Sequence, residues 1–256
     1  MVTVKHSHYW QDSQLHQDAL VEAYQELTNP GDVEARFASF LTLLRSGDSV
    51  AAGVAMDHYE MSESGSRMGG VNPLDVYSGE VLQIARATLE SPPSPASLSP
   101  HTGEGANHAS ALLATANIIS PQDFRLVKKI IDTTTNGEVR NLALASCSRV
   151  VGAKDADDIE FVQLLGVIAY DVREAPQNRI SAISALGSMN TDQSVEALSI
   201  AMGDPDISIQ AHIALAILQM DCAARWIDQL KRLAASWPAK APFPADDVRD
   251  LLEDEW

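Results

Sequence analysis

The chain has 256 residues, and its 35 acidic residues outnumber its 18 basic residues, which gives a formal net charge of -17. This excess of acid argues against a general nucleic-acid binder and against a protein of anionic membranes, because both need surplus lysine and arginine. With 45% hydrophobic and 5% aromatic residues, the composition is that of a globular chain with few large aromatic anchors.

The sequence favours a soluble protein of a reducing compartment, which we expect to be the cytoplasm. Its two cysteines, Cys147 and Cys222, lie far apart and in no metal-binding or disulfide spacing. The first residues lack the apolar stretch of a signal peptide. No run of about 18 apolar residues predicts a membrane-spanning helix.

Apolar residues recur at helical spacing along nearly the whole chain, and the alternation typical of strands is almost absent. The clearest stripes lie within residues 33–44, 74–88, 109–116, 124–131, 161–168, 195–202 and 207–218. Turn and capping residues separate them at 29–32, 47–48, 120–121, 136–137, 175–176 and 204–206. About twelve helices are predicted, and the short breaks between them favour antiparallel packing of neighbours.

Two stretches interrupt this rhythm. Residues 62–73 are polar and glycine-rich, and residues 91–105 contain four prolines that no helix can cross. We interpret 91–105 as a long loop within one continuous array, with a domain linker as the alternative. The predicted organisation is N-terminal helical repeats over 1–90 with a polar loop at 62–73, the loop 91–105, repeats over 106–235 and an acidic tail over 236–256.

An internal repeat is visible in the C-terminal half. Similar helix starts occur at 138–145, 177–187 and 206–216, and a fainter copy occurs at 32–39. The sequence Asp204-Pro205-Asp206 precedes a helix of small apolar residues, and Arg140 and Arg179 stand in the first turns of the earlier two. In these features the chain resembles the HEAT-repeat family, including its bacterial lyase-like branch.

The resemblance implies an all-α fold, a right-handed α-solenoid of about five to six antiparallel helix pairs. In that family an aspartate at the turn between repeats and a basic residue of the next repeat form a ladder of hydrogen bonds. Carried over, the ladder residues are Asp171, Arg179, Arg140, Asp204 and Asp206, with Asp171 and Arg179 as the leading pair. Gln210 stands where the next basic residue would be, so we expect the ladder to be uncharged there.

The densest cluster of polar and aromatic residues precedes the polar loop and predicts a small binding site. Its members are Asp57, His58, Tyr59, Glu60, Arg67, Asn72, Asp75 and Tyr77. On a helix that contains Val50 and Val54, Asp57 continues the apolar stripe, so it faces inward or lines an edge. The alternative is structural, with Asp57 capping a turn and His58 exposed.

No catalytic residue set, metal site or cofactor is predicted. His6 and His8 have no acidic or cysteine ligand at a suitable spacing, and Trp10 beside them is expected to cover the first helix pair. The glycines of the polar loop match neither a phosphate-binding nor a dinucleotide-binding motif. Iron hydroxylases of the HEAT family carry repeated His-Glu pairs, but none of the seven histidines here precedes a glutamate. HEAT-like DNA glycosylases need a basic groove, which the charge argues against.

The leading hypothesis is a non-enzymatic, protein-binding α-solenoid whose acidic surface attracts a basic protein. Such a partner would be a nucleic-acid-binding protein, or a toxin that an immunity protein blocks. Neither nucleic acid nor a membrane is expected to bind directly. The alternatives are a small-ligand binder or enzyme that uses Asp57 to Tyr77, and a structural spacer. The charge is -8 over residues 1–128 and -9 over 129–256, so no separate acidic domain causes it.

Overall fold

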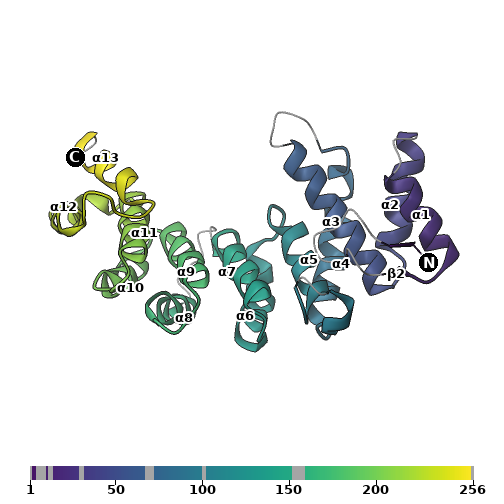
Figure 1. The fold of residues 1–256 in the computed structure, drawn as a ribbon, viewed down its shortest axis with the longest axis horizontal. Coiled ribbons are helices and arrows are strands. Elements are labelled where there is room, and N and C mark those ends of the chain that lie inside the picture. The colour runs from purple at the N-terminus through teal and green to yellow at the C-terminus, as the bar shows by residue number, and fades with distance from the viewer. Residues whose placement is uncertain are drawn as a thin grey trace. The chain divides into compact units, whose positions relative to one another are not determined.

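The computed structural model of the chain describes residues 2–3, 10, 14–28, 32–66, 72–99, 102–151 and 159–254. Most of this part of the chain is helical (Figure 1). Its α-helices are α1 (Asp18–Thr28), α2 (Val33–Leu44), α3 (Ser49–Ser66), α4 (Ser78–Glu90), α5 (Ala106–Thr115), α6 (Phe124–Thr133), α7 (Gly137–Val151), α8 (Ile159–Tyr170), α9 (Pro176–Met189), α10 (Asp192–Ala201), α11 (Ile207–Leu218), α12 (Ile227–Ser236) and α13 (Ala245–Asp254). The all-α class predicted from the spacing of apolar residues is confirmed.

Shorter elements complete the described chain. Single 3-10 turns occur at η1 (Asp75–Tyr77), η2 (Ala96–Leu98), η3 (Pro121–Asp123) and η4 (Ala223–Arg225). Strand β1 (Val2–Thr3) pairs antiparallel with β2 (Gln14–Leu15), with Val2 opposite Leu15. The sequence did not predict this pair, because strands of two residues are too short to show alternation.

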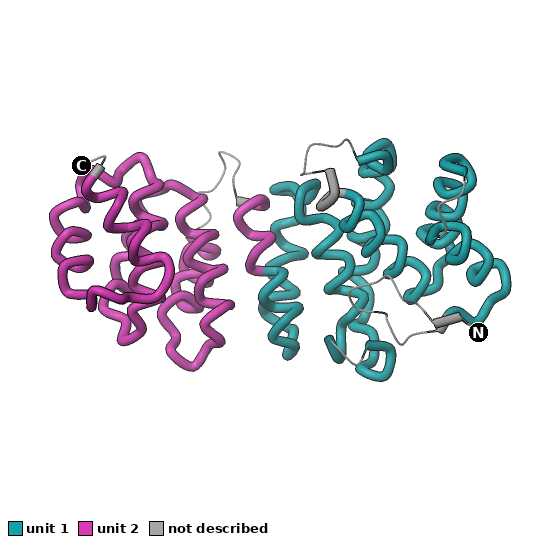
Figure 2. Tube along the Cα trace, turned by 45° about the horizontal axis from the view of Figure 1, so that its top comes forward, with its two compact units in different colours: residues 1–143 teal, residues 144–256 magenta. Residues whose placement is uncertain are grey.

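The chain divides into two compact units, residues 1–143 (unit 1) and 144–256 (unit 2), shown in Figure 2. The division falls inside α7 and not at the proline-rich stretch 91–105. Two reciprocal hydrogen bonds hold that stretch to α5. The amide of Ser94 donates to Asn107 Oδ1 at 2.8 Å, and the amide of Asn107 donates to Ser94 Oγ at 3.2 Å. The described part of 91–105 is therefore a packed loop of unit 1.

Several helices begin at the capping residues that the sequence indicates. Asp48 Oδ1 accepts from the amides of Val50 and Ala51 at 2.9 Å, at the start of α3. Asp206 Oδ1 accepts from the amide of Ser208 at 2.8 Å, at the start of α11. These carboxylates satisfy amides of the first turn that have no partner within the helix. Equivalent contacts begin α2 and α7, at Asp32 and Asn136.

In unit 1, α1 packs on α2, α2 packs on α3, and α5 packs on both α3 and α4. Trp10 is fully buried, and its Nε1 donates to Ser110 Oγ of α5 at 2.9 Å. The indole lies directly over Gly53 of α3, where there is no Cβ to exclude it. These contacts place its ring at α3 and α5, whereas the sequence predicted that Trp10 covers the first helix pair.

In unit 2, helices that are two apart in the sequence pack together as well as immediate neighbours. Helix α8 contacts both α9 and α10, and α9 contacts α11 (Figure 1). Small residues allow this: a Cβ atom on Gly187 of α9 would lie 3.1 Å from the Cβ of Ala216 on α11. Helix α13 packs on α11 and α12. Helices α8 and α10 therefore form one layer of this unit, and α9 and α11 form the other.

Candidate functional site

The residues predicted as a small binding site begin in the middle of α3. Asp57 and Tyr59 are fully buried, whereas His58 and Glu60 are half-buried. Asp57 faces inward, as its place in the apolar stripe indicates. It is not the capping acid of a turn, because α3 continues to Ser66 and so includes the first five residues of the predicted loop 62–73.

The remaining members of that set lie after α3. Asn72 Oδ1 accepts from the amide of Leu74 at 2.9 Å, which shapes the turn before η1. Asp75 is exposed at the start of η1. The ring of Tyr77 packs edge-on against Phe37 of α2, with a centroid distance of 6.0 Å. Asn72 and Tyr77 therefore have structural contacts, and Arg67 lies outside the described residues, as do His6 and His8.

The predicted ladder pair Asp171 and Arg179 is not the pair that forms. The guanidinium of Arg179 bonds the carboxylate of Asp204, and both side chains are buried. Asp171 instead pairs with exposed Arg173, whose Nε lies 2.9 Å from Asp171 Oδ1. The side-chain and backbone hydrogen bonds from Arg173 lower the pKa of Asp171 to about 2. Arg173 is nearer to Asp171 in the sequence and pairs with it at the surface. Arg179 pairs instead with Asp204, in the turn that follows α10.

A second contact recurs at the first turns of α7, α9 and α11. One side chain in each turn donates to a backbone carbonyl near the end of the preceding helix: Arg140 to Ile131, Arg179 to Ala169 and Gln210 to Asp204. Gln210 Oε1 also accepts from Trp237 Nε1 at 2.7 Å. The neutral Gln210 therefore keeps the carbonyl contact without a charge, and Asp206 acts as the cap of α11 described above.

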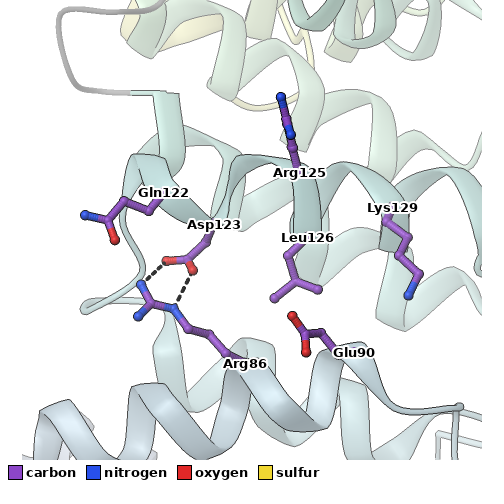
Figure 3. Close-up of a pocket in the computed structure, with 7 residues that line it drawn as sticks. All are labelled: Arg86, Glu90, Gln122, Asp123, Arg125, Leu126 and Lys129. Atoms are coloured by element: carbon purple, nitrogen blue, oxygen red, sulfur yellow. Dashed lines mark hydrogen bonds and ion pairs between the residues drawn. The ribbon is translucent and has the colours of Figure 1, made fainter.

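A cavity of about 680 Å³ lies between α4 and α6 in unit 1 (Figure 3). Its lining residues are Arg86, Glu90, Gln122, Asp123, Arg125, Leu126 and Lys129. Arg86 Nε lies 2.6 Å from Asp123 Oδ1, and its second nitrogen lies 3.0 Å from Oδ2. Burial raises the pKa of Asp123, but hydrogen bonds from Arg86 and Ser120 outweigh burial and hold that pKa below its ordinary value.

Five of the seven side chains that line this cavity are charged. Figure 3 shows Arg125 pointing away from Arg86, while Glu90 and Lys129 lie at the other end. Its seven lining residues include no histidine, cysteine or hydroxyl group, and Asp123 is held by Arg86. This cavity was not predicted from the sequence, although Arg125 and Lys129 at helical spacing are an unusual basic pair in so acidic a chain.

Replacing Arg86 with glutamine tests this ion pair. We expect Arg86→Gln to lower the free energy of unfolding by about 1–2 kcal/mol at pH 7, because buried Asp123 keeps its charge without a cation. The pKa of Asp123 is lower in the folded protein than its ordinary 3.8, so the pair stabilises above that value and is lost as the pH falls through the folded pKa. Urea unfolding from pH 7 to about 3 should show the difference between the two proteins shrinking in acid. A constant difference would contradict the assignment.

A groove of about 340 Å³ lies between α8 and α10 in unit 2. Its lining residues are Ile159, Val162, Gln163, Gly166, Val167, Tyr170, Gln193, Glu196, Ala197 and Ile200. Four of its large hydrophobic residues are exposed: Ile159, Val167, Tyr170 and Ile200. Ile200 is the most exposed of them, at 71%. Of these ten residues only Glu196 carries a charge. The groove is therefore an apolar surface that faces solvent.

The surroundings of this groove are acidic. Residues 159–201 contain five acids (Glu160, Asp171, Glu174, Asp192 and Glu196) against Arg173 and Arg179. Both arginines are engaged, Arg173 with Asp171 and Arg179 with Asp204. This groove was not predicted from the sequence, because its apolar residues continue the same helical stripes as the core.

No protein-family model, curated protein or solved structure matches the chain. Among the described residues, no three histidines, cysteines or acids gather to hold a metal ion. Over the same residues, no helix has both the length and the apolar character that a bilayer crossing requires.

Proposed function

We propose that this chain is a helical-repeat protein, a right-handed α-solenoid of HEAT-like helix pairs, that acts by binding a basic protein partner. The observation that carries the proposal is the exposed apolar groove between α8 and α10 within an acidic unit. A partner whose activity is blocked by this contact, as an immunity protein blocks a toxin, is one form of the function.

The apolar part of the surface supports a protein partner. Large apolar side chains on neighbouring helices mark interaction sites when they form one patch, because leaving them in water is unfavourable. Tyr170 and Ile200 stand on opposite sides of this groove. A tyrosine that a partner covers is among the residues that most often dominate the binding energy of a protein interface.

The charge supports a basic partner. Unit 2 contains 9 basic and 18 acidic residues, a net charge of -9. Such a surface speeds the encounter with a positively charged protein and repels nucleic acid and anionic membranes. The groove then supplies apolar contact after the charges have brought the partner near.

The proposal predicts groove-dependent capture of basic proteins. Ile200→Asp should reduce the retained partner at least about tenfold, because it places a charge where apolar contact forms. The matched control is Val76→Asp in unit 1, since Val76 is 78% exposed and lies far from this groove in sequence. Both substitutions are at exposed positions, so each should change the free energy of unfolding by only about 0.5 kcal/mol.

The measurement is quantitative capture from cell extract on immobilised wild-type chain and on both variants, at about 50 mM and about 200 mM salt. The proposal predicts that basic proteins are retained by the wild-type chain and by Val76→Asp at the lower salt concentration. The same proteins should be lost from Ile200→Asp, and from every bait at the higher salt concentration. An identical retained set on all three baits would refute the proposal.

A further inference from the structure

We infer that the groove between α8 and α10 receives one amphipathic α-helix of the basic partner, with lysine or arginine beside its apolar stripe. This inference rests on the proposed function and goes further, because it names the structural form of the segment that binds. It follows from the period of the lining residues, the backbone of the groove walls, the groove floor and the charge.

The lining residues repeat with the period of a helix on both walls. On α8 the stripe runs from Ile159 through Val162 and Gly166 to Tyr170, and on α10 it runs from Gln193 to Ile200. Eleven steps along α8 span about 16 Å at 1.5 Å per residue, which is about three turns of a bound helix. Side chains of such a helix at every third or fourth residue would meet ridges of matching period.

The backbone of the walls favours a helix over an extended strand. The lining residues lie within α8 and α10, where amides and carbonyls in the helix interior bond one another. An extended peptide that adds to a protein by β-pairing needs a free strand edge, which two helices do not offer. A helix satisfies its own backbone and presents only side chains, so it suits these walls.

The floor of the groove accommodates large apolar side chains. Gly166 of α8 faces Ala197 of α10, and a Cβ atom on Gly166 would lie 3.4 Å from the Cβ of Ala197. Tyr170 of α8 and Ile200 of α10 also line the groove and are exposed. A leucine or isoleucine of the bound helix would lie over the small pair and contact the larger residues around it.

The charge selects a basic helix over the chain's own copies. Glu196 lies in the wall of the groove, and the two arginines of residues 159–201 are already engaged. A second copy of the chain would bring another -9 unit against this one. Helix α13 is acidic as well, and its apolar residues Val248 and Leu252 are buried.

Designed peptides test the inference with the full-length chain. The probe is an amidated peptide of about 14 residues, with leucine at helical spacing and lysine at the other positions. One control peptide replaces each lysine with glutamate, and another has the first composition rearranged into alternation. We expect fluorescence anisotropy to show the basic helical peptide binding at least about tenfold more tightly than either control.

Variants of the chain locate the binding. Ile200→Asp should weaken the basic helical peptide at least about tenfold, Val76→Asp should leave it unchanged, and Glu196→Lys should move the preference toward the glutamate peptide. Equal binding of the alternating peptide, or binding that Ile200→Asp does not affect, would overturn the inference. So would the absence of peptide binding, including the case in which the chain forms a dimer that Ile200→Asp dissociates.

The two proposals fail separately. Groove-dependent capture of basic proteins, without binding of the helical peptide, would leave the proposed function standing and refute the helical form of the partner. Peptide binding in the groove, without capture of any basic protein, would support the helix and refute the proposed function.

Discussion

Gly53→Ala is expected to expel Trp10 from unit 1 and to lower the free energy of unfolding by about 3–5 kcal/mol, the range for losing a buried tryptophan. A Cβ atom at residue 53 would lie 2.3 Å from Trp10 Nε1 and 2.4 Å from its Cε2. Such distances are far inside van der Waals contact, and the indole is rigid and fully buried. The ring therefore cannot yield by a small rotation, and it must leave its site.

Unfolding in urea of Gly53→Ala, Trp10→Ala and the double variant measures this coupling. The losses should be far from additive, because the alanine at residue 53 has nothing to clash with once the indole is gone. Hydrogen exchange of the Trp10 indole proton, which Ser110 accepts, should be slow in wild type and fast in Gly53→Ala. Additive losses with a protected indole would show that the core adapts around the new methyl group.

The helical class was predictable because periodicity is a local property. Caps such as Asp48 and Asp206 were visible as well, since a carboxylate that accepts amides two residues ahead needs no distant contact. The end of α3 was not predictable in this way. Its last residues, 62–66, contain no apolar side chain, so the periodic signal stops before the helix does.

The candidate site was less predictable because it depends on which side of a helix is covered. In α8, Phe161 and Leu165 are buried while Val167 and Tyr170 are exposed, and all four belong to an apolar sequence. The packing of α9 and α10 decides which side faces solvent. The cavity lined by Arg86 and Asp123 likewise joins residues from two helices whose neighbourhood the sequence does not state.

The partner of Arg179 likewise depends on which turns lie close together in space, which the sequence does not state. Asp204→Ala is expected to lower the free energy of unfolding of unit 2 by about 3–5 kcal/mol, because the guanidinium stays buried without its carboxylate. Both side chains are nearly inaccessible, at 5% and 3% exposure. Arg179 keeps its bond to the carbonyl of Ala169, but a neutral acceptor does not compensate a buried charge.

Urea unfolding of Asp204→Ala beside Asp171→Ala distinguishes the two partners that Arg179 could have. Asp171 lies at the surface with Arg173, so its removal should leave unfolding nearly unchanged. Arg179→Met combined with Asp204→Leu should recover part of the loss, because no charge then remains buried. If Asp171→Ala were the more damaging change, Arg179 would depend on the aspartate at the preceding turn, as the resemblance to HEAT repeats implies. In the structure Arg179 pairs instead with Asp204, in the turn between α10 and α11. Asp204 Oδ1 also accepts a hydrogen bond from the amide of Asp206 at 2.8 Å, so the same carboxylate supports the turn that leads into α11.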